Sequence, residues 1–110
     1  MFLLEENKNN RMTLTRGDDV AFRMAPNYKD GVEYTLKQGD VMEMTCRKKY
    51  GEPIAFSVVS DRTGTIRIEH DDTASLTPGY YIYDITLTFA DGKTNTIVNA
   101  ATLELIREVK

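Results

Sequence analysis

Apolar and polar residues alternate with a period of two along most of this chain. Between Tyr80 and Phe89 the odd positions are aromatic or aliphatic, whereas Asp84, Thr86 and Thr88 occupy even positions. Successive side chains of a β-strand point to opposite faces, so this stretch predicts a strand with one apolar and one mostly polar face. An α-helix would scatter the same residues around its circumference.

The same alternation recurs in other stretches and predicts further strands, each with one face for a core and one for water. The residues expected to face the core are Val20, Phe22, Met24, Met42, Met44, Cys46, Ile54, Phe56, Val58, Ile66, Ile68, Leu103, Leu105 and Val109. No window of ten residues has helical periodicity. Residues 71–76 are compatible with a single helical turn capped by Asp72 or Thr73.

Turn signals rich in Gly, Pro and Asp separate the expected strands. They lie at residues 16–19, 30–31, 38–40, 50–53, 61–64, 77–79 and 91–92, and the turn residues singled out are Gly17, Asp18, Gly39, Asp40, Pro78, Gly79, Asp91 and Gly92. Asp91-Gly92 predicts a hairpin with a type I′ turn. The spacing is typical of a sandwich or barrel, and we predict an all-β, antiparallel two-sheet sandwich of about seven or eight strands.

Length and charge narrow the possible functions. The chain has 110 residues and a net charge of −3, with acidic and basic residues interspersed. This is the size of one domain, and the missing basic excess argues against nucleic-acid binding. No stretch approaches the length of a membrane span, and the start lacks a signal-peptide core. We therefore expect no membrane contact and no secretion by a signal peptide.

We expect one domain over residues 12–110, preceded by an N-terminal segment. Residues 1–11 begin with Met1-Phe2-Leu3-Leu4 and continue with polar residues. Such a segment can be an arm that adds to a neighbour's sheet or an edge strand of its own domain, and we slightly favour the edge strand. Phe2, Leu3 and Leu4 are candidate interface residues. Tyr80 is another candidate interface residue. It should point to the face of the strand opposite to that of Tyr81 and Tyr83, and so towards solvent.

The sequence offers no arrangement of catalytic, cofactor-binding or metal-binding residues. His70 is the only histidine, and Cys46, the only cysteine, shares the inward parity of Met42 and Met44. His70-Asp71-Asp72 lacks the spaced oxygen ligands that calcium requires. The tripeptide Arg16-Gly17-Asp18 is explained by turn chemistry, since Gly-Asp recurs at residues 39–40. We expect neither an enzyme nor a cofactor or metal.

Several segments together resemble a family of short structural proteins encoded in phages and prophages of Gram-positive bacteria. The segment from Asp72 to Ile85 carries the resemblance most clearly, with Asp-Thr, a leucine, and a glycine before aromatic residues and Tyr-Asp-Ile. The other matching segments are residues 14–18, 38–41, 91–92, 96–98 and 107–110. One departure is Asp18-Asp19, where the family usually has Asp-Thr. A more distant resemblance is to the N-terminal module of baseplate upper proteins.

The resemblance implies an immunoglobulin-like sandwich and a virion component of the tail, baseplate or head surface. The expected location is the virion, with the host cytoplasm during assembly. The expected partners are other phage structural proteins, and self-association is compatible with the symmetry of phage particles. The family brings no catalytic residues. The alternative function is a carbohydrate- or surface-binding β-sandwich module.

Overall fold

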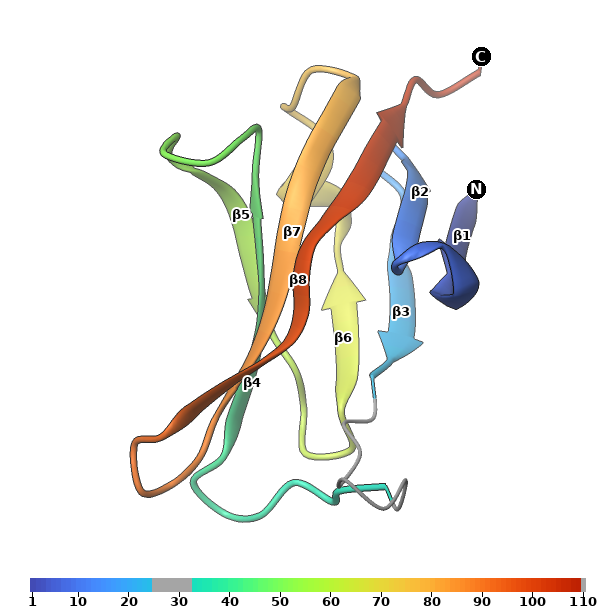
Figure 1. The fold of residues 1–110 in the computed structure, drawn as a ribbon. Coiled ribbons are helices and arrows are strands. Elements are labelled where there is room, and N and C mark those ends of the chain that lie inside the picture. The colour runs from blue at the N-terminus through green and yellow to red at the C-terminus, as the bar shows by residue number, and fades with distance from the viewer. Residues whose placement is uncertain (25–32, 110) are drawn as a thin grey trace.

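The computed structural model describes residues 1–24 and 33–109, so the Asp30-Gly31 turn signal and Lys110 lie outside the described residues. Strands dominate these ranges (Figure 1). In chain order the elements are β1 (Phe2–Glu5), the 3-10 helix η1 (Glu6–Lys8), β2 (Arg11–Thr15), β3 (Val20–Arg23), β4 (Val41–Arg47), β5 (Ile54–Val59), β6 (Thr65–Ile68), α1 (His70–Thr73), β7 (Gly79–Thr88) and β8 (Thr94–Ile106).

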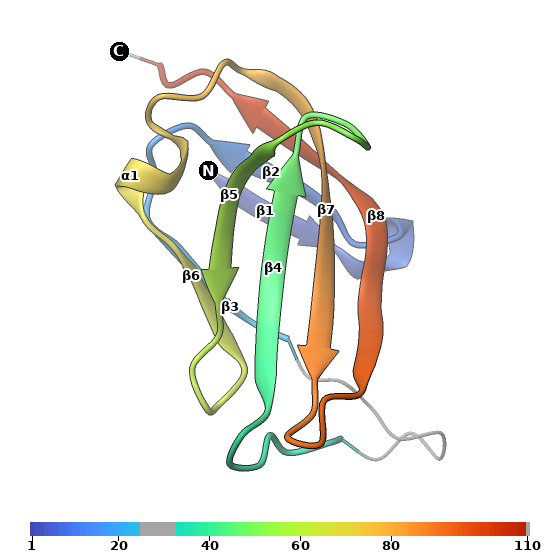
Figure 2. The same ribbon diagram turned by 90° about the vertical axis from the view of Figure 1, so that its left-hand side faces the viewer.

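The strands form a large and a small sheet that face each other (Figures 1 and 2). The large sheet has six strands in the order β1-β2-β8-β7-β4-β5, and β3 pairs with β6 in the small sheet. One core fills the space between them. Its fully buried residues include Met44 and Ile85 from the large sheet and Ile66 and Ile68 from the small one. The expected alternation is therefore present where it was strongest, in β4, β6 and β7.

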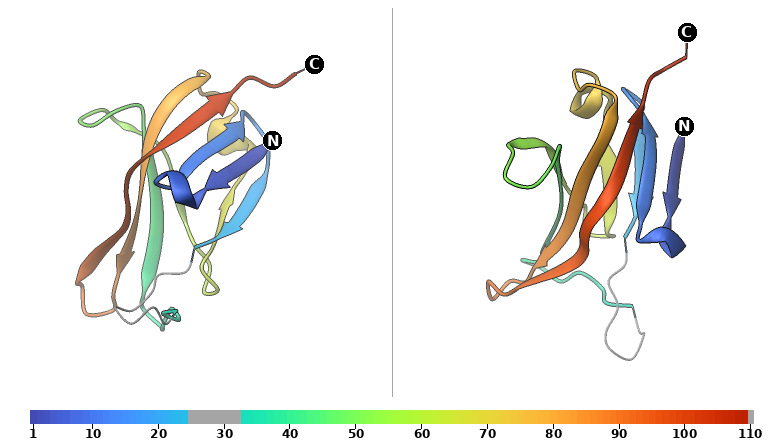
Figure 3. Two further views of the ribbon diagram at one scale, coloured as in Figure 1. Left: turned by 45° about the vertical axis from the view of Figure 1, so that its right-hand side comes forward. Right: turned by 45° about the horizontal axis from the view of Figure 1, so that its top comes forward.

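The prediction of an antiparallel fold is wrong for one strand pair. β2 runs parallel to β8, with Met12 opposite Leu103 and Thr15 opposite Ile106, so the six-stranded sheet is mixed. All other pairs are antiparallel. β8 lies between β7 and β2 (Figure 3), and only its last part, from Leu103 to Ile106, pairs with β2.

A β-bulge bends β8 just before the stretch that pairs with β2. Tyr83 is opposite Ala101 and Ile85 is opposite Val98, so Asp84 alone faces two residues of β8. One of them, Ala100, has φ 53°, a left-handed conformation that is costly for a residue with a Cβ. Its amide donates to Asp84 Oδ1 at 2.6 Å, which compensates for the ladder hydrogen bond lost at the bulge.

Two residues that alternation placed in the core are exposed. Ile54 is 51% exposed because the register of β4 and β5 shifts at Cys46 and Arg47, which puts Ile54 opposite Arg47 on the outer face. Val109 is 99% exposed because β8 ends at Ile106 and the chain leaves the sheet. The alternation continues past the end of the strand without any core to face.

The helical turn and the last hairpin also differ from expectation. α1 begins at His70, and its N-cap is Glu69 rather than Asp72 or Thr73, because Glu69 and Asp72 cap each other's backbone amides in a capping box. The Asp91-Gly92 hairpin is not type I′, since only Gly92 has a positive φ. Gly92 donates to the Phe89 carbonyl at 2.9 Å, and Phe89 donates to Lys93 at 2.8 Å, as in a three-residue loop with a left-handed glycine.

Replacing Asp84 should destabilise the domain by removing the acceptor at the bulge. We expect Asp84→Ala to lower the free energy of unfolding by about 1–3 kcal/mol, because the Ala100 amide is left unpaired. Asp84→Asn, which keeps an acceptor, should lose less. Thr86→Ala on the same face of β7 is the control, and urea unfolding is the measurement. Equal losses in Asp84→Ala and Thr86→Ala would contradict this role.

Candidate functional site

The segments that carry the family resemblance contact one another at both ends of the domain. At one end the first corner, residues 15–19, contacts α1. The hydroxyl of Thr73, which is fully buried, accepts a hydrogen bond from the Gly17 amide at 2.8 Å. His70 Nδ1 lies 2.7 Å from the Gly17 carbonyl oxygen, and the His70 amide donates to Asp19 Oδ1 at 2.7 Å. Here Gly17 takes a positive φ of 81°, a conformation that favours glycine.

The polar groups of the first corner are occupied in structural contacts. Arg16 forms an ion pair with Glu108 at 2.5 Å and donates to the Leu76 carbonyl at 3.3 Å. A depression of about 360 Å³ is lined by Arg16, Gly17, His70, Ala74 and Glu108. The nearest partner of the imidazole is a backbone carbonyl rather than a nucleophile, so this arrangement fixes the corner and offers no acid–base pair.

At the other end the second corner, residues 37–40, contacts the closing hairpin. Asp40 accepts hydrogen bonds from the Tyr34 hydroxyl at 2.6 Å, the Lys37 amide at 2.9 Å and the Ala90 amide at 3.2 Å. These bonds hold the pKa of Asp40 below its usual value, with the Tyr34 bond as the largest cause. A Cβ on Gly39 would lie 2.7 Å from the Ala90 Cβ, so the close approach requires glycine.

Pro78, Gly79 and the first residues of β7 form the turn that leads from α1 into the large sheet. The Tyr81 hydroxyl donates to the Thr77 carbonyl at 2.7 Å, across this turn. Lys48 lies over the ring of Tyr81, 4.6 Å from its centroid. A Cβ on Gly79 would meet the same lysine nitrogen at 2.9 Å. The turn residues thus position Tyr81 at the edge of the core.

The outer face of the large sheet, which points away from the small sheet, carries Tyr80. Tyr80 is 59% exposed, and the guanidinium of Arg11 lies 5.8 Å from its ring centroid. Arg11 also pairs with Glu104 at 2.8 Å, and Glu104 is the cross-strand neighbour of Tyr80. This group joins a tyrosine and an arginine, the side chains most enriched at the centres of protein interfaces.

Apolar residues extend the group around Tyr80 across the same face. Ile82 shares the parity of Tyr80, and its neighbour on β4 is Arg47, which in turn faces the exposed Ile54. Cross-strand partners share a face of the sheet, so these three side chains form a row beside Tyr80. Sequence parity could have identified Ile82. Arg11 and Ile54 could not be found that way, because the parallel pairing and the register shift place them there.

The N-terminal candidates do not form a single exposed surface. β1 pairs with β2 as an edge strand of its own sheet. The Phe2 ring stacks on Phe22, 5.6 Å between centroids, and Leu4 packs against the core. Only Leu3 points outward, with 43% exposure. Phe2 and Leu4 therefore contribute to packing within the domain.

Cys46 is buried in the core, and burial raises the pKa of its thiol to about 12. It is therefore a thiol at neutral pH and a poor nucleophile. Among residues 1–24 and 33–109, no three His, Cys, Asp or Glu side chains gather where they could hold a metal ion. Within the same ranges no helix is long and apolar enough to cross a membrane.

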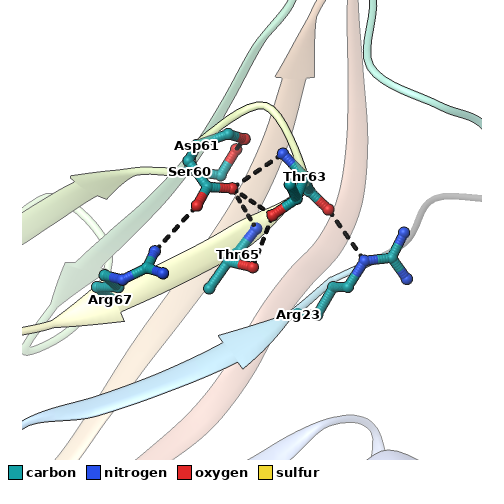
Figure 4. Close-up of polar contacts among 6 residues, drawn as sticks. All are labelled: Arg23, Ser60, Asp61, Thr63, Thr65 and Arg67. Atoms are coloured by element: carbon teal, nitrogen blue, oxygen red, sulfur yellow. Dashed lines mark hydrogen bonds and ion pairs between the residues drawn. The ribbon is translucent and has the colours of Figure 1, made fainter.

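The turn between β5 and β6 is organised by one carboxylate (Figure 4). Asp61 Oδ1 accepts from the Thr63 amide at 2.9 Å, the Thr63 hydroxyl at 2.6 Å and the Thr65 amide at 3.1 Å. Arg67 donates to Asp61 Oδ2 at 2.9 Å. These bonds, with that from the Thr63 hydroxyl as the largest cause, hold the pKa of Asp61 far below its usual value.

No family model matches this chain, and no curated protein matches its sequence. A function for it therefore has to be inferred from its residues and their geometry.

Removing the Thr73 hydroxyl should loosen the first corner. We expect Thr73→Val, which keeps the volume, to lower the free energy of unfolding by about 1–3 kcal/mol, because the Gly17 amide loses its acceptor. Thr73→Ser, which keeps the hydroxyl, should lose less. Amide hydrogen exchange at Gly17, followed by NMR, should accelerate in Thr73→Val alone. Unchanged protection of Gly17 would show that the contact does not hold the corner.

Asp61 should make stability depend on pH in the acid range. Its folded pKa is lowered, so its contribution is complete above the unfolded pKa of about 3.9 and is lost as the pH falls towards the folded pKa. Wild type should therefore melt at a higher temperature than Asp61→Asn at pH 7, and the difference should shrink below pH about 4. Thermal melts of both proteins between neutral and acid pH measure this. A constant difference would rule out ionised Asp61 as its source.

Proposed function

We propose that this chain is a non-enzymatic structural component of a bacteriophage particle, in the tail, the baseplate or the head surface, and that it acts through contacts with other phage proteins. The family resemblance motivates the location. The observation that carries the mode of action is the outer face centred on Tyr80, where an exposed tyrosine, an arginine over its ring and the aliphatic side chains of Ile82 and Ile54 share one surface.

We also propose that the fold is an immunoglobulin-like sandwich. The order β8-β7-β4-β5 in one layer opposite β3-β6 in the other corresponds to strands G, F, C and C′ opposite B and E of that fold. The Tyr81 hydroxyl bonds to the Thr77 carbonyl at the turn into β7. This is the position and the contact of the tyrosine corner of immunoglobulin domains.

The physical case for docking through the face around Tyr80 is its composition. Tyrosine adds a large contact area with few rotatable bonds, and arginine adds planar hydrogen-bond donors. Arg11 is already oriented by Glu104 at 2.8 Å, so little of its side-chain freedom remains to be lost on binding. Glu104, beside Tyr80 and Arg11, is a charged residue of the kind that forms the polar rim of protein interfaces.

The matched segments of the resemblance support a structural role. They lie in corners whose polar groups bond to one another, from Gly17 to Thr73 and from Asp40 to Ala90. Such contacts hold loops in place. A domain that maintains fixed loops around an apolar and aromatic face is suited to repeated contacts in a symmetric assembly.

Purified phage particles test the proposal. The chain should be detected by mass spectrometry in particles from the host strain that carries its gene. Tyr80→Ala should reduce its incorporation at least about fivefold, since truncating a tyrosine at the centre of an interface costs about 1 kcal/mol or more. Tyr50→Ala, which alters another exposed tyrosine, is the control, and the melting temperature of both variants should match wild type. Absence of the chain from particles would overturn the proposal.

A further inference from the structure

β5 is an edge strand whose sequence lacks the residues that usually prevent pairing with another chain. It is the last strand of the large sheet, and its sequence Ile54-Ala55-Phe56-Ser57-Val58-Val59 contains no charged residue, proline or glycine. Natural edge strands usually carry such residues to prevent the addition of further strands. Val59 is 56% exposed, and β-branched residues like it favour strand pairing.

The backbone of β5 presents unpaired hydrogen-bonding groups along this edge. The Ser60 amide donates to the Met42 carbonyl at 2.8 Å, so residues 60, 58 and 56 direct their backbone groups towards β4. Antiparallel pairing alternates up to the register shift at Ala55, and Ser57 and Val59 therefore direct their N–H and C=O groups away from the sheet. Within residues 1–24 and 33–109, no strand pairs with β5 on that side.

A groove lies beside this edge. It has a volume of about 290 Å³ and is lined by residues 58–61 of the β5 end and by Thr65, Arg67 and Glu69 of the opposite layer. In Figure 2, β6 and α1 lie behind β5 and reach past it on the side away from β4. A strand added to β5 would therefore have β6 and α1 as a floor beneath one of its faces.

The charges around the groove are mostly negative. Arg67 is paired with Asp61 at 2.9 Å, so these two charges offset each other. Glu69 forms no ion pair with any residue in the described part of the chain, and Asp71 and Asp72 follow it on α1. An occupant of the groove would thus meet an acidic floor and an uncharged strand edge.

We propose that the β5 edge binds an extended segment of another polypeptide, which adds to the sheet as a further strand with basic side chains towards Glu69. Its backbone would bond to residues 57 and 59. Alternate apolar side chains would lie on the outer face beside Val59. A second copy of β5 fits less well, because it carries no basic residue and would bring two acidic floors together.

This site is separate from the face around Tyr80 and does not depend on the docking proposed above. Addition of a strand to a sheet edge is a general mode of peptide recognition, in which the backbone supplies affinity and the side chains supply selectivity. Tyr80→Ala should therefore leave strand binding unchanged. Failure of strand binding would likewise leave incorporation into particles unaffected.

The test uses the full chain and two synthetic peptides. The basic probe is acetyl-Val-Lys-Val-Lys-Val-Thr-amide, and the acidic probe has Glu in place of both Lys residues. In an NMR titration of isotope-labelled protein, the basic probe should shift the amide signals of Ser57 and Val59 and slow their hydrogen exchange. The acidic probe should bind at least about tenfold more weakly, because it would face Glu69 with like charge.

Two variants locate the binding. Ser57→Pro removes an amide that points away from β4, so the strand should form while the basic probe binds at least about tenfold more weakly. Ser57→Val keeps the amide and should bind like wild type. If Ser57→Pro does not fold, Glu69→Gln serves instead, and it should reduce the preference for the basic probe. No binding at millimolar peptide, shifts confined to other surfaces, or equal binding of both probes would overturn the proposal.

Discussion

The hydrogen bond between Asp84 and the Ala100 amide fixes the bend in β8 on which the arrangement of the large sheet depends. β8 pairs with β7 along its length, and its last part, from Leu103 to Ile106, also pairs with β2. The bulge lies directly before this part, and β1 joins the sheet only through β2. The bend therefore places Arg11 next to Glu104 and Tyr80, and creates the polar and aromatic group on the outer face.

The two corners maintain this arrangement from the ends of the domain. The first corner is bonded to α1, and the second is bonded to the closing hairpin. Each contact joins segments that are far apart in the chain, and each includes a glycine with positive φ. The turn residues identified in the sequence thus have a shared physical role. They connect loops whose positions set the ends of β2, β4 and β8.

Alternation was sufficient to predict the strands whose two faces meet clearly different surroundings. β4 and β7 are such strands, and the outward orientation of Tyr80 follows from parity alone. Alternation cannot register a bulge, so it predicts the wrong face for Ile54, and it cannot detect where the core ends, so it predicts a core position for Val109. The parallel pairing of β2 with β8 joins segments about ninety residues apart, and no local pattern indicates it. Arg11 was therefore missing from the predicted interface.

The parallel pairing of β2 with β8 has a mechanical consequence. The start of β2 and the end of β8 lie at opposite ends of their paired stretch, from Met12 with Leu103 to Thr15 with Ile106. A pull that separates Arg11 from Ile106 runs along both strands, and it loads the hydrogen bonds between them together in shear. In an antiparallel hairpin pulled at its open end, the bonds would break one after another. This strand pair thus resists tension applied at Arg11 and Ile106 better than an antiparallel hairpin of the same length would.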